Sequence, residues 1–185
     1  MRRRTFLTSA SALVLAATLP ARAAIEITWD DLVPPEGLGK KMDRTAAQQV
    51  DSAIGLNEFD GNAEDLELFL QDVRAMREFQ PEGDEINVIL HGTEIKLAGY
   101  VTPVGFDEES ITEFLFVPYM GACIHVPPPA PNQIIYAKDV KGLKLEQMYD
   151  PVYLTGTLTA KAVKTMVADI GYSLEGGTVT PYDDW

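Results

Sequence analysis

The chain has 185 residues, of which 46% are hydrophobic and 23% are charged, and these values are typical of a globular protein. They exclude a wholly disordered chain, a collagen-like chain and a protein with several membrane spans. The 15 basic and 28 acidic side chains give a formal net charge of −13, which argues against non-specific nucleic-acid binding because that binding needs clustered Lys and Arg.

The first 23 residues predict an export signal. Three arginines at 2–4 precede a short apolar stretch around 13–19, and residues 21–23 form the small-x-small pattern of a cleavage site. This stretch is shorter than the roughly 20 apolar residues of a membrane-spanning helix. We therefore expect a periplasmic protein with no stable membrane anchor after signal cleavage. The run 3–7, Arg-Arg-Thr-Phe-Leu, resembles the twin-arginine signal of proteins exported in the folded state, and a Sec signal is the alternative.

Cleavage would make the chain more acidic. The signal contains four arginines and no acid, so the mature chain would keep 11 basic and 28 acidic residues, a formal charge of −17. This charge favours cations or a basic protein as partners over anions. Cys123 is the only cysteine, which rules out an internal disulfide and predicts a free thiol, a metal ligand or a buried apolar side chain.

Residues 24–84 are predicted to form an N-terminal extension with helices. Alternation over 25–29 predicts a short strand, and Asp43 is placed to cap a helix over 44–54. The clearest helix is predicted over 63–79, where apolar residues recur at i, i+3, i+4, i+7 and i+10. A Pro- and Gly-containing stretch over 80–84 ends it.

From residue 86 the hydrophobic period changes to two. Strands are predicted over 86–90, 94–101, 114–117, 133–137, 152–158, 170–174 and 178–180. The solid apolar run 114–117 is typical of a strand buried on both faces. Gly99 and Gly156 interrupt two strands of similar pattern, as in a small, strongly curved barrel. We therefore predict that residues 85–185 form a mainly β domain, a small OB-like barrel with the helical N-terminal segment packed against it; a small sandwich is the alternative.

The segment 117–133 concentrates the candidate chemistry, with the only cysteine, one of the two histidines and five of the 12 prolines. Cys123 and His125 are two residues apart, so on an extended segment their side chains project to the same side. Such a pair suits ligation of zinc or copper(I), or activation of the thiolate by the imidazole. A buried cysteine with a hydrogen-bonded histidine is the structural alternative. The residues expected to support the loop are Tyr119, Asn132 and Gln133.

Other motifs give little support for an enzyme. His91 precedes Gly92 and is predicted to lie in a turn rather than to bind a metal. The sequence has no G-x-S-x-G, Walker, G-x-G-x-x-G, H-E-x-x-H or EF-hand pattern.

The segment 114–133, FLFVPYMGACIHVPPPAPNQ, resembles the hallmark motif of a bacterial exported family known as domain of unknown function 3299. The family motif reads approximately FLLVPYFGACIHVPPPPPNQ, and the resemblance covers roughly residues 86–182. Met120 replaces the usual aromatic residue and Ala130 interrupts the proline run. The resemblance implies an envelope protein, since members are often periplasmic or lipid-anchored and some are associated with export-type ABC transporters. No lipobox cysteine lies near the cleavage point here.

These observations predict a non-enzymatic binding or accessory protein of the periplasm. It would engage a transition metal, with Cys123 and His125 as ligands, or an envelope protein or ABC-transport component, through the proline-rich loop. One alternative is a thiol enzyme or redox protein with Cys123 as nucleophile. Another is a purely structural protein-interaction module. Nucleic-acid binding is suggested only by the OB-like fold, and the acidic charge disfavours it.

Overall fold

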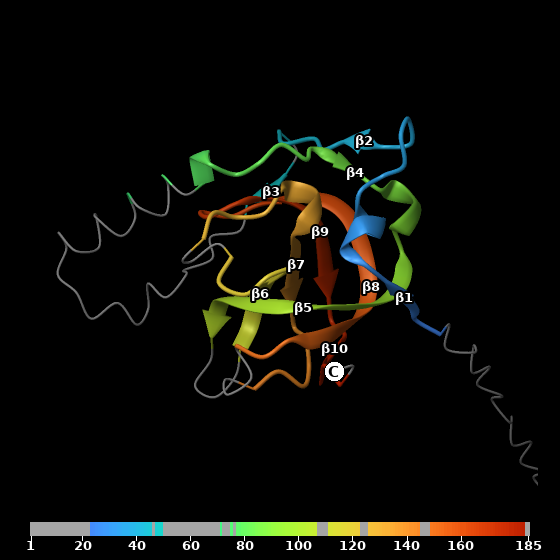
Figure 1. Ribbon diagram of the computed structural model, residues 1–185, viewed down its shortest axis with the longest axis vertical. Helices are drawn as coiled ribbons and strands as arrows, with labels where there is room; N and C mark the ends of the chain where they lie inside the picture. Colours follow the sequence, from blue (N-terminus) through green and yellow to red (C-terminus); the bar gives the residue numbers. More distant parts are fainter. Residues whose placement is uncertain are drawn as a thin grey trace, which may run out of the picture.

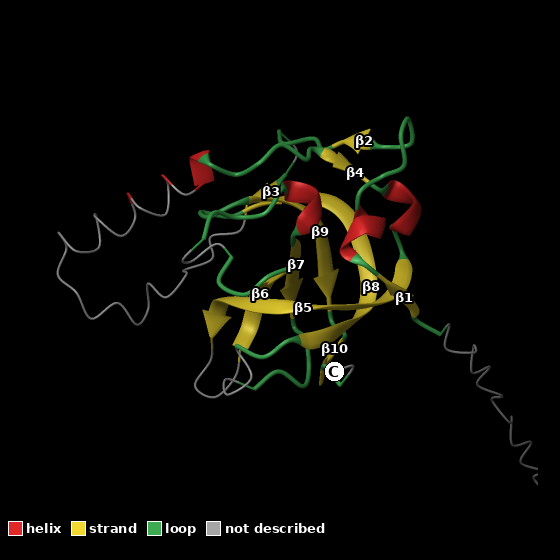
Figure 2. Cartoon of the chain, in the orientation of Figure 1, coloured by secondary structure: helices red, strands yellow, loops and turns green. Residues whose placement is uncertain are grey.

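A computed structural model describes residues 23–45, 47–49, 71, 75, 77–106, 111–122, 126–144 and 149–183. The predicted export signal and most of the predicted helix over 63–79 lie outside these residues. Figure 1 shows a barrel of strands with short strands and turns gathered at one end, and Figure 2 shows that strands dominate the described chain. Among the described helices, none has the length and hydropathy of a membrane-spanning segment.

Five strands close the barrel. They follow the order β5-β6-β7-β9-β8, and β8 pairs back onto β5. Every pairing around the ring is antiparallel except β7 with β9, which is parallel. The closed ring confirms a mainly β protein with a small barrel and excludes the sandwich. The five strands are β5 (Thr93–Phe106), β6 (Ile111–Val117), β7 (Ile135–Lys138), β8 (Val152–Lys164) and β9 (Asp169–Glu175).

Additional short strands extend the sheet. Parallel to β5 runs β1 (Ile25–Ile27), and antiparallel to β8 runs β10 (Thr178–Pro181). A separate two-stranded sheet joins β2 (Lys40–Lys41) to β4 (Glu85–Ile86). Because β1 precedes residue 84 and pairs with a barrel strand, chain from both sides of the predicted domain boundary contributes to one sheet. The boundary itself stays a prediction.

The helix predicted over 44–54 is wrong where the structure describes it. Residues Gln48–Gln49 form β3, which pairs in parallel with β8. Asp43 accepts a hydrogen bond from the backbone N–H of Thr45 at 2.9 Å, two residues on, which closes a turn instead of capping a helix. Residues 46 and 50–54 lie outside the description.

The helical N-terminal segment is not supported by the described residues. Of the helix predicted over 63–79, only 71, 75, 77 and 78 are described as helical. The rest of the described segment contains strands and the 3-10 turn η1 (Trp29–Leu32). The strand predicted over 86–90 is also wrong, because Asn87 accepts from the backbone N–H of Ile89 and starts the 3-10 turn η3 (Val88–Leu90).

Two apolar clusters lie on opposite faces of β6. They confirm the prediction that its apolar run forms a strand buried on both faces. Phe114 and Phe116 belong to the cluster inside the barrel, whereas Leu115 and Val117 belong to the second cluster. All four side chains are fully buried. A strand buried on both faces has no polar alternation, as the sequence indicates.

Trp29, at the start of η1, covers the barrel wall at Gly99. Its ring nitrogen Nε1 donates to the carbonyl of Ala98 at 2.8 Å, and its ring centroid lies 5.6 Å from that of Phe116. A Cβ at Gly99 would lie 2.8 Å from Trp29 Cζ2. The missing side chain therefore makes room for the indole ring.

Tyr172 joins the N-terminal segment to the barrel interior. Its hydroxyl donates to the carbonyl of Leu32 and accepts from the backbone N–H of Asn87, each at 2.6 Å. Burial raises the pKa of Tyr172 to about 12. The hydroxyl is thus a permanent donor at neutral pH, and one buried group satisfies two backbone groups from separate segments.

Candidate functional site

The predicted ligands Cys123 and His125 lie outside the described residues, so the metal site stays a prediction. The structure does describe both ends of this short segment. Ala122 and Val126 form an isolated bridge, and the backbone N–H of Val126 donates to the carbonyl of Gly121 at 3.2 Å. Within the described part of the chain, no group of three or more His, Cys, Asp and Glu side chains could hold a metal ion.

The stem of the loop is fixed to the barrel. Thr102 of β5 is buried and donates from Oγ1 to the carbonyl of Ala122 at 2.9 Å. The hydroxyl of Tyr119 donates to the carbonyl of Pro127 at 3.2 Å, which ties the two arms of the loop together. Gly121 has a φ of 80°, a left-handed conformation that favours glycine.

The described residues of the loop also present apolar side chains to solvent. Tyr119 is 40% exposed, Met120 57% and Val126 43%. Exposed apolar side chains are common one at a time, but three on one anchored loop form a candidate contact surface. We call these three residues the loop tip.

The proline run behind the loop tip packs against the N-terminal segment. Pro128, Pro129 and Pro131 are buried, and Pro131–Gln133 form the 3-10 turn η4. Asn132 Nδ2 donates to the carbonyl of Glu85 at 3.0 Å, and Gln133 Nε2 donates to the carbonyl of Trp29 at 2.9 Å. These bonds hold β4 and η1 to the base of the loop.

A polar network around the buried Asp169, beside the loop, was not predicted from the sequence. Gln80 Nε2 donates to the carbonyls of Asp169 and Pro129 at 2.7 and 2.9 Å, and Gln80 Oε1 accepts from the backbone N–H of Asp169 at 2.9 Å. The carboxylate of Asp169 is buried and accepts from Arg44 at 2.9 Å and from Arg77 at 2.5 Å. Arg44 also pairs with Asp84. No motif signals this network, because its members are brought together only by the fold.

Replacing Asp169 with asparagine should lower the free energy of unfolding by about 2 kcal/mol, because it removes the negative charge and one of the two oxygens that accept from the arginines while keeping the residue volume. Urea unfolding of the variant and the parent measures this loss. The change Asp150→Asn, at an exposed position, is the control and should stay within about 0.5 kcal/mol. Equal losses in the two variants would contradict a stabilising role for the network.

His91 lies in the predicted turn, directly after η3 and before Gly92, which has a φ of 74°. Its ring nitrogen Nδ1 accepts from the backbone N–H of Ala160 at 3.2 Å. Ala160 borders an irregularity in the pairing of β8 with β9. His91 therefore accepts from a backbone N–H of β8, a structural use of the imidazole.

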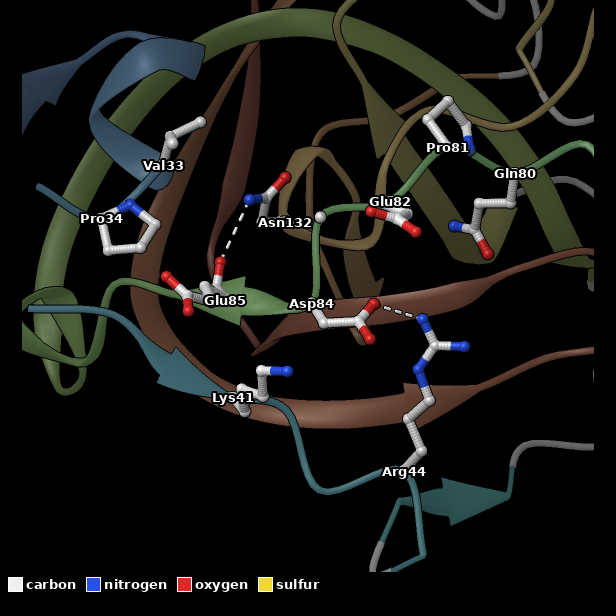
Figure 3. A pocket seen from close by; sticks show the side chains of 11 residues that line it. Val33, Pro34, Lys41, Arg44, Gln80, Pro81, Glu82, Asp84, Glu85 and Asn132 are labelled. Carbon is white, nitrogen blue, oxygen red and sulfur yellow. Dashed lines mark hydrogen bonds and ion pairs between the residues drawn. The ribbon is translucent and has the colours of Figure 1, made fainter. Parts of the chain in front are cut away.

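An open groove of about 860 Å³ lies between the N-terminal segment and the base of the proline-rich loop. Figure 3 shows Lys41 and Arg44 on one side and three acidic residues, Glu82, Asp84 and Glu85, facing them. Its lining residues are Val33, Pro34, Lys41, Arg44, Gln80, Pro81, Glu82, Gly83, Asp84, Glu85 and Asn132. The mixture of charges and backbone groups suits ligand binding.

Two buried tyrosine hydroxyls with raised pKa values, Tyr136 and Tyr172, act as hydrogen-bond donors. Tyr136 donates to Glu113 Oε2 at 2.7 Å, and burial first, then the bond to Glu113, raises its pKa well above the ordinary value. Like Tyr172, it stays protonated at neutral pH, so neither hydroxyl supplies the phenolate that nucleophilic attack needs.

Comparisons with known proteins agree on one family. The family model described as protein of unknown function (DUF3299) matches residues 29–181. A crystal structure of a DUF3299 family protein from Pseudomonas aeruginosa PAO1 is similar, with 32% sequence identity and a TM-score of 0.63, over 89% of this chain and 99% of that one. No curated protein matches significantly. The family assignment from the proline-rich motif is thereby confirmed, and the chain belongs to the DUF3299 family.

Proposed function

We propose that this protein is a non-enzymatic binding module of the bacterial periplasm and that it engages a protein partner through the loop tip. The observation that carries the proposal is an anchored loop with exposed apolar side chains. The stem is bonded to β5 through Thr102 and Ala122, while Met120 and Val126 face solvent. Side chains on an anchored stretch of backbone lose little conformational freedom on binding, which favours affinity.

The fold is compatible with this use. Its ring order β5-β6-β7-β9-β8, with β8 returning to β5 and one parallel pairing, supports the assignment as an OB-like barrel. Such barrels bind many kinds of ligand, so the fold alone does not choose one. The acidic net charge of −13 supports a partner that is not a nucleic acid. An envelope protein or a component of an ABC transporter fits the family resemblance.

The test places a photo-crosslinking amino acid at position 120 and, as the control, at position 149, where Tyr149 is 68% exposed. We expect a discrete protein adduct in living cells from position 120 and none from position 149. The changes Tyr119→Ser and Val126→Ser, made together, should abolish the adduct, because they remove the apolar neighbours of Met120. Identical adduct patterns from both positions would contradict the proposal.

Metal binding is the competing outcome at the same loop. Zinc and copper(I) affinity are measured on the protein and on the double variant Cys123→Ala/His125→Ala. Tight, stoichiometric binding that the double variant loses would make the loop a metal site, as the sequence also allows. Equal, weak binding by both proteins would assign it to the acidic surface and leave the loop as a protein contact.

A further inference from the structure

Asn132 carries a buried acceptor that no donor of the described residues reaches. The residue is only 6% exposed, and its Nδ2 donates to the carbonyl of Glu85 at 3.0 Å. Because a carbonyl only accepts, this bond fixes which end of the amide is nitrogen. No hydrogen bond to Oδ1 is found within the described part of the chain, although buried acceptors are normally satisfied.

This oxygen lies against Gly83, which has no side chain to cover it. A Cβ at Gly83 would lie 2.8 Å from Asn132 Oδ1. Both residues line the groove. Figure 3 shows the amide oxygen turned away from the carbonyl of Glu85 that holds the nitrogen. The lining of the groove therefore includes an oriented acceptor that has no donor among the described residues.

Two carboxylates that line the same groove have no ion pair with a described residue. Asp84 is paired with Arg44, but neither Glu82 nor Glu85 makes an ion pair with any described residue. Lys41 also lines the groove and makes no ion pair with a described residue. The charges of Glu82, Glu85 and Lys41 therefore sum to one negative charge. At the opposite end, Val33 and Pro34 add apolar surface. The groove thus combines an acceptor, excess negative charge and an apolar end.

We propose that this groove binds a lysine-containing peptide segment. The ammonium group of the lysine donates to Asn132 Oδ1 and pairs with Glu82 or Glu85, and an apolar side chain of the peptide packs on Val33 and Pro34. A volume of about 860 Å³ lies in the range of sites that enclose a ligand much larger than one ammonium group. The net charge of −13 attracts such a peptide from a distance. This site is separate from the loop tip and does not depend on its function.

Fluorescence anisotropy of the full protein with a labelled, end-blocked hexapeptide, Gly-Lys-Val-Gly-Lys-Gly, tests the proposal. The matched probe replaces both lysines with norleucine, which keeps the methylene chain and removes the charge. We expect the lysine peptide to bind about tenfold more tightly, and the double variant Glu82→Gln/Glu85→Gln to remove that preference. Asp150→Asn is the charge control and should change the affinity less than about twofold.

A second readout reports on the acceptor itself. Addition of the lysine peptide should shift the side-chain amide NMR signal of Asn132, because its oxygen gains a donor. Equal binding of the two peptides, or unchanged binding by the double variant, would overturn the proposal. Displacement of the peptide by an equal concentration of spermidine would also overturn it, since the apolar contacts of a peptide would then add nothing.

Discussion

Replacing Gly99 with alanine should destabilise the protein by about 3 kcal/mol, at the upper end of what overpacking usually costs. The new Cβ would lie 2.8 Å from Trp29 Cζ2, 2.8 Å from the carbonyl oxygen of Val117 and 2.9 Å from Phe116 Cζ. Val117 is paired with Tyr100 in the β5–β6 ladder, so its carbonyl cannot withdraw without disturbing the barrel. Trp29 could move only by losing its bond to Ala98.

Urea unfolding followed by tryptophan fluorescence measures this effect. Trp29 is one of two tryptophans, and its emission should shift to longer wavelength if the ring leaves the barrel wall. Gly37→Ala is the control, since Gly37 has a φ of 77° but nothing within 4 Å of the added Cβ. Its cost should be about 1 kcal/mol, from backbone strain alone. A Gly99→Ala variant no less stable than the control would show that the wall tolerates the methyl group.

Replacing Tyr172 with phenylalanine should cost about 3 kcal/mol below pH 10, because it leaves two backbone groups, the N–H of Asn87 and the carbonyl of Leu32, without their buried partner. Urea unfolding at neutral pH measures this loss. Tyr100→Phe is the matched control, since no hydrogen bond of its hydroxyl is found among the described residues. It should change the stability by less than about 0.5 kcal/mol.

The pH dependence of the stability difference between the parent and Tyr172→Phe gives an independent check. The pKa of Tyr172 is about 12 in the folded protein, above the ordinary value of 10.0. From pH 10 to 12 the unfolded tyrosine loses its proton while the folded one keeps it, so the stability contributed by this group falls as the pH rises. The gap between parent and Tyr172→Phe should therefore be full below pH 10 and shrink towards pH 12. A gap independent of pH would mean that the hydroxyl titrates alike in both states.

The sequence predicts the barrel well because its strands carry a local signal. Alternation predicts β9 and β10, and the solid apolar run predicts a strand buried on both faces where β6 lies. Gly99 and Gly156 are also informative, since each lies where an added Cβ would meet a neighbouring side chain at about 3 Å or less. These signals depend on residues close in the sequence, which a pattern can detect.

The N-terminal segment was harder to predict because distant partners decide its conformation. Gln48–Gln49 is a strand only because β8 offers an edge at Val163 and Lys164. The 3-10 turn η3 replaces a strand because the single side chain of Asn87 satisfies a nearby N–H. Tertiary contacts thus override local propensity at both places.

The candidate site likewise contains residues that a local motif indicates and residues that only the fold brings together. The proline-rich motif directs attention to Asn132 and Gln133, but their partners Glu85 and Trp29 lie 47 and 104 positions away. Asp169, Arg44 and Arg77 belong to no motif, and only the fold brings them together. The roles of Cys123 and His125 stay predictions.

The parallel pairing of β1 with β5 constrains how the chain can fold as it is made. Ile25 pairs with Ile95, 70 positions later, and β3 pairs with β8 over a still longer separation. The ring itself closes only when β9 fills the gap between β7 and β8. An incomplete chain on the ribosome therefore has open strand edges until β9 emerges, and such non-local pairing makes folding slow. A binding partner that holds those edges during synthesis would protect the chain from aggregation at the stage when it is most exposed.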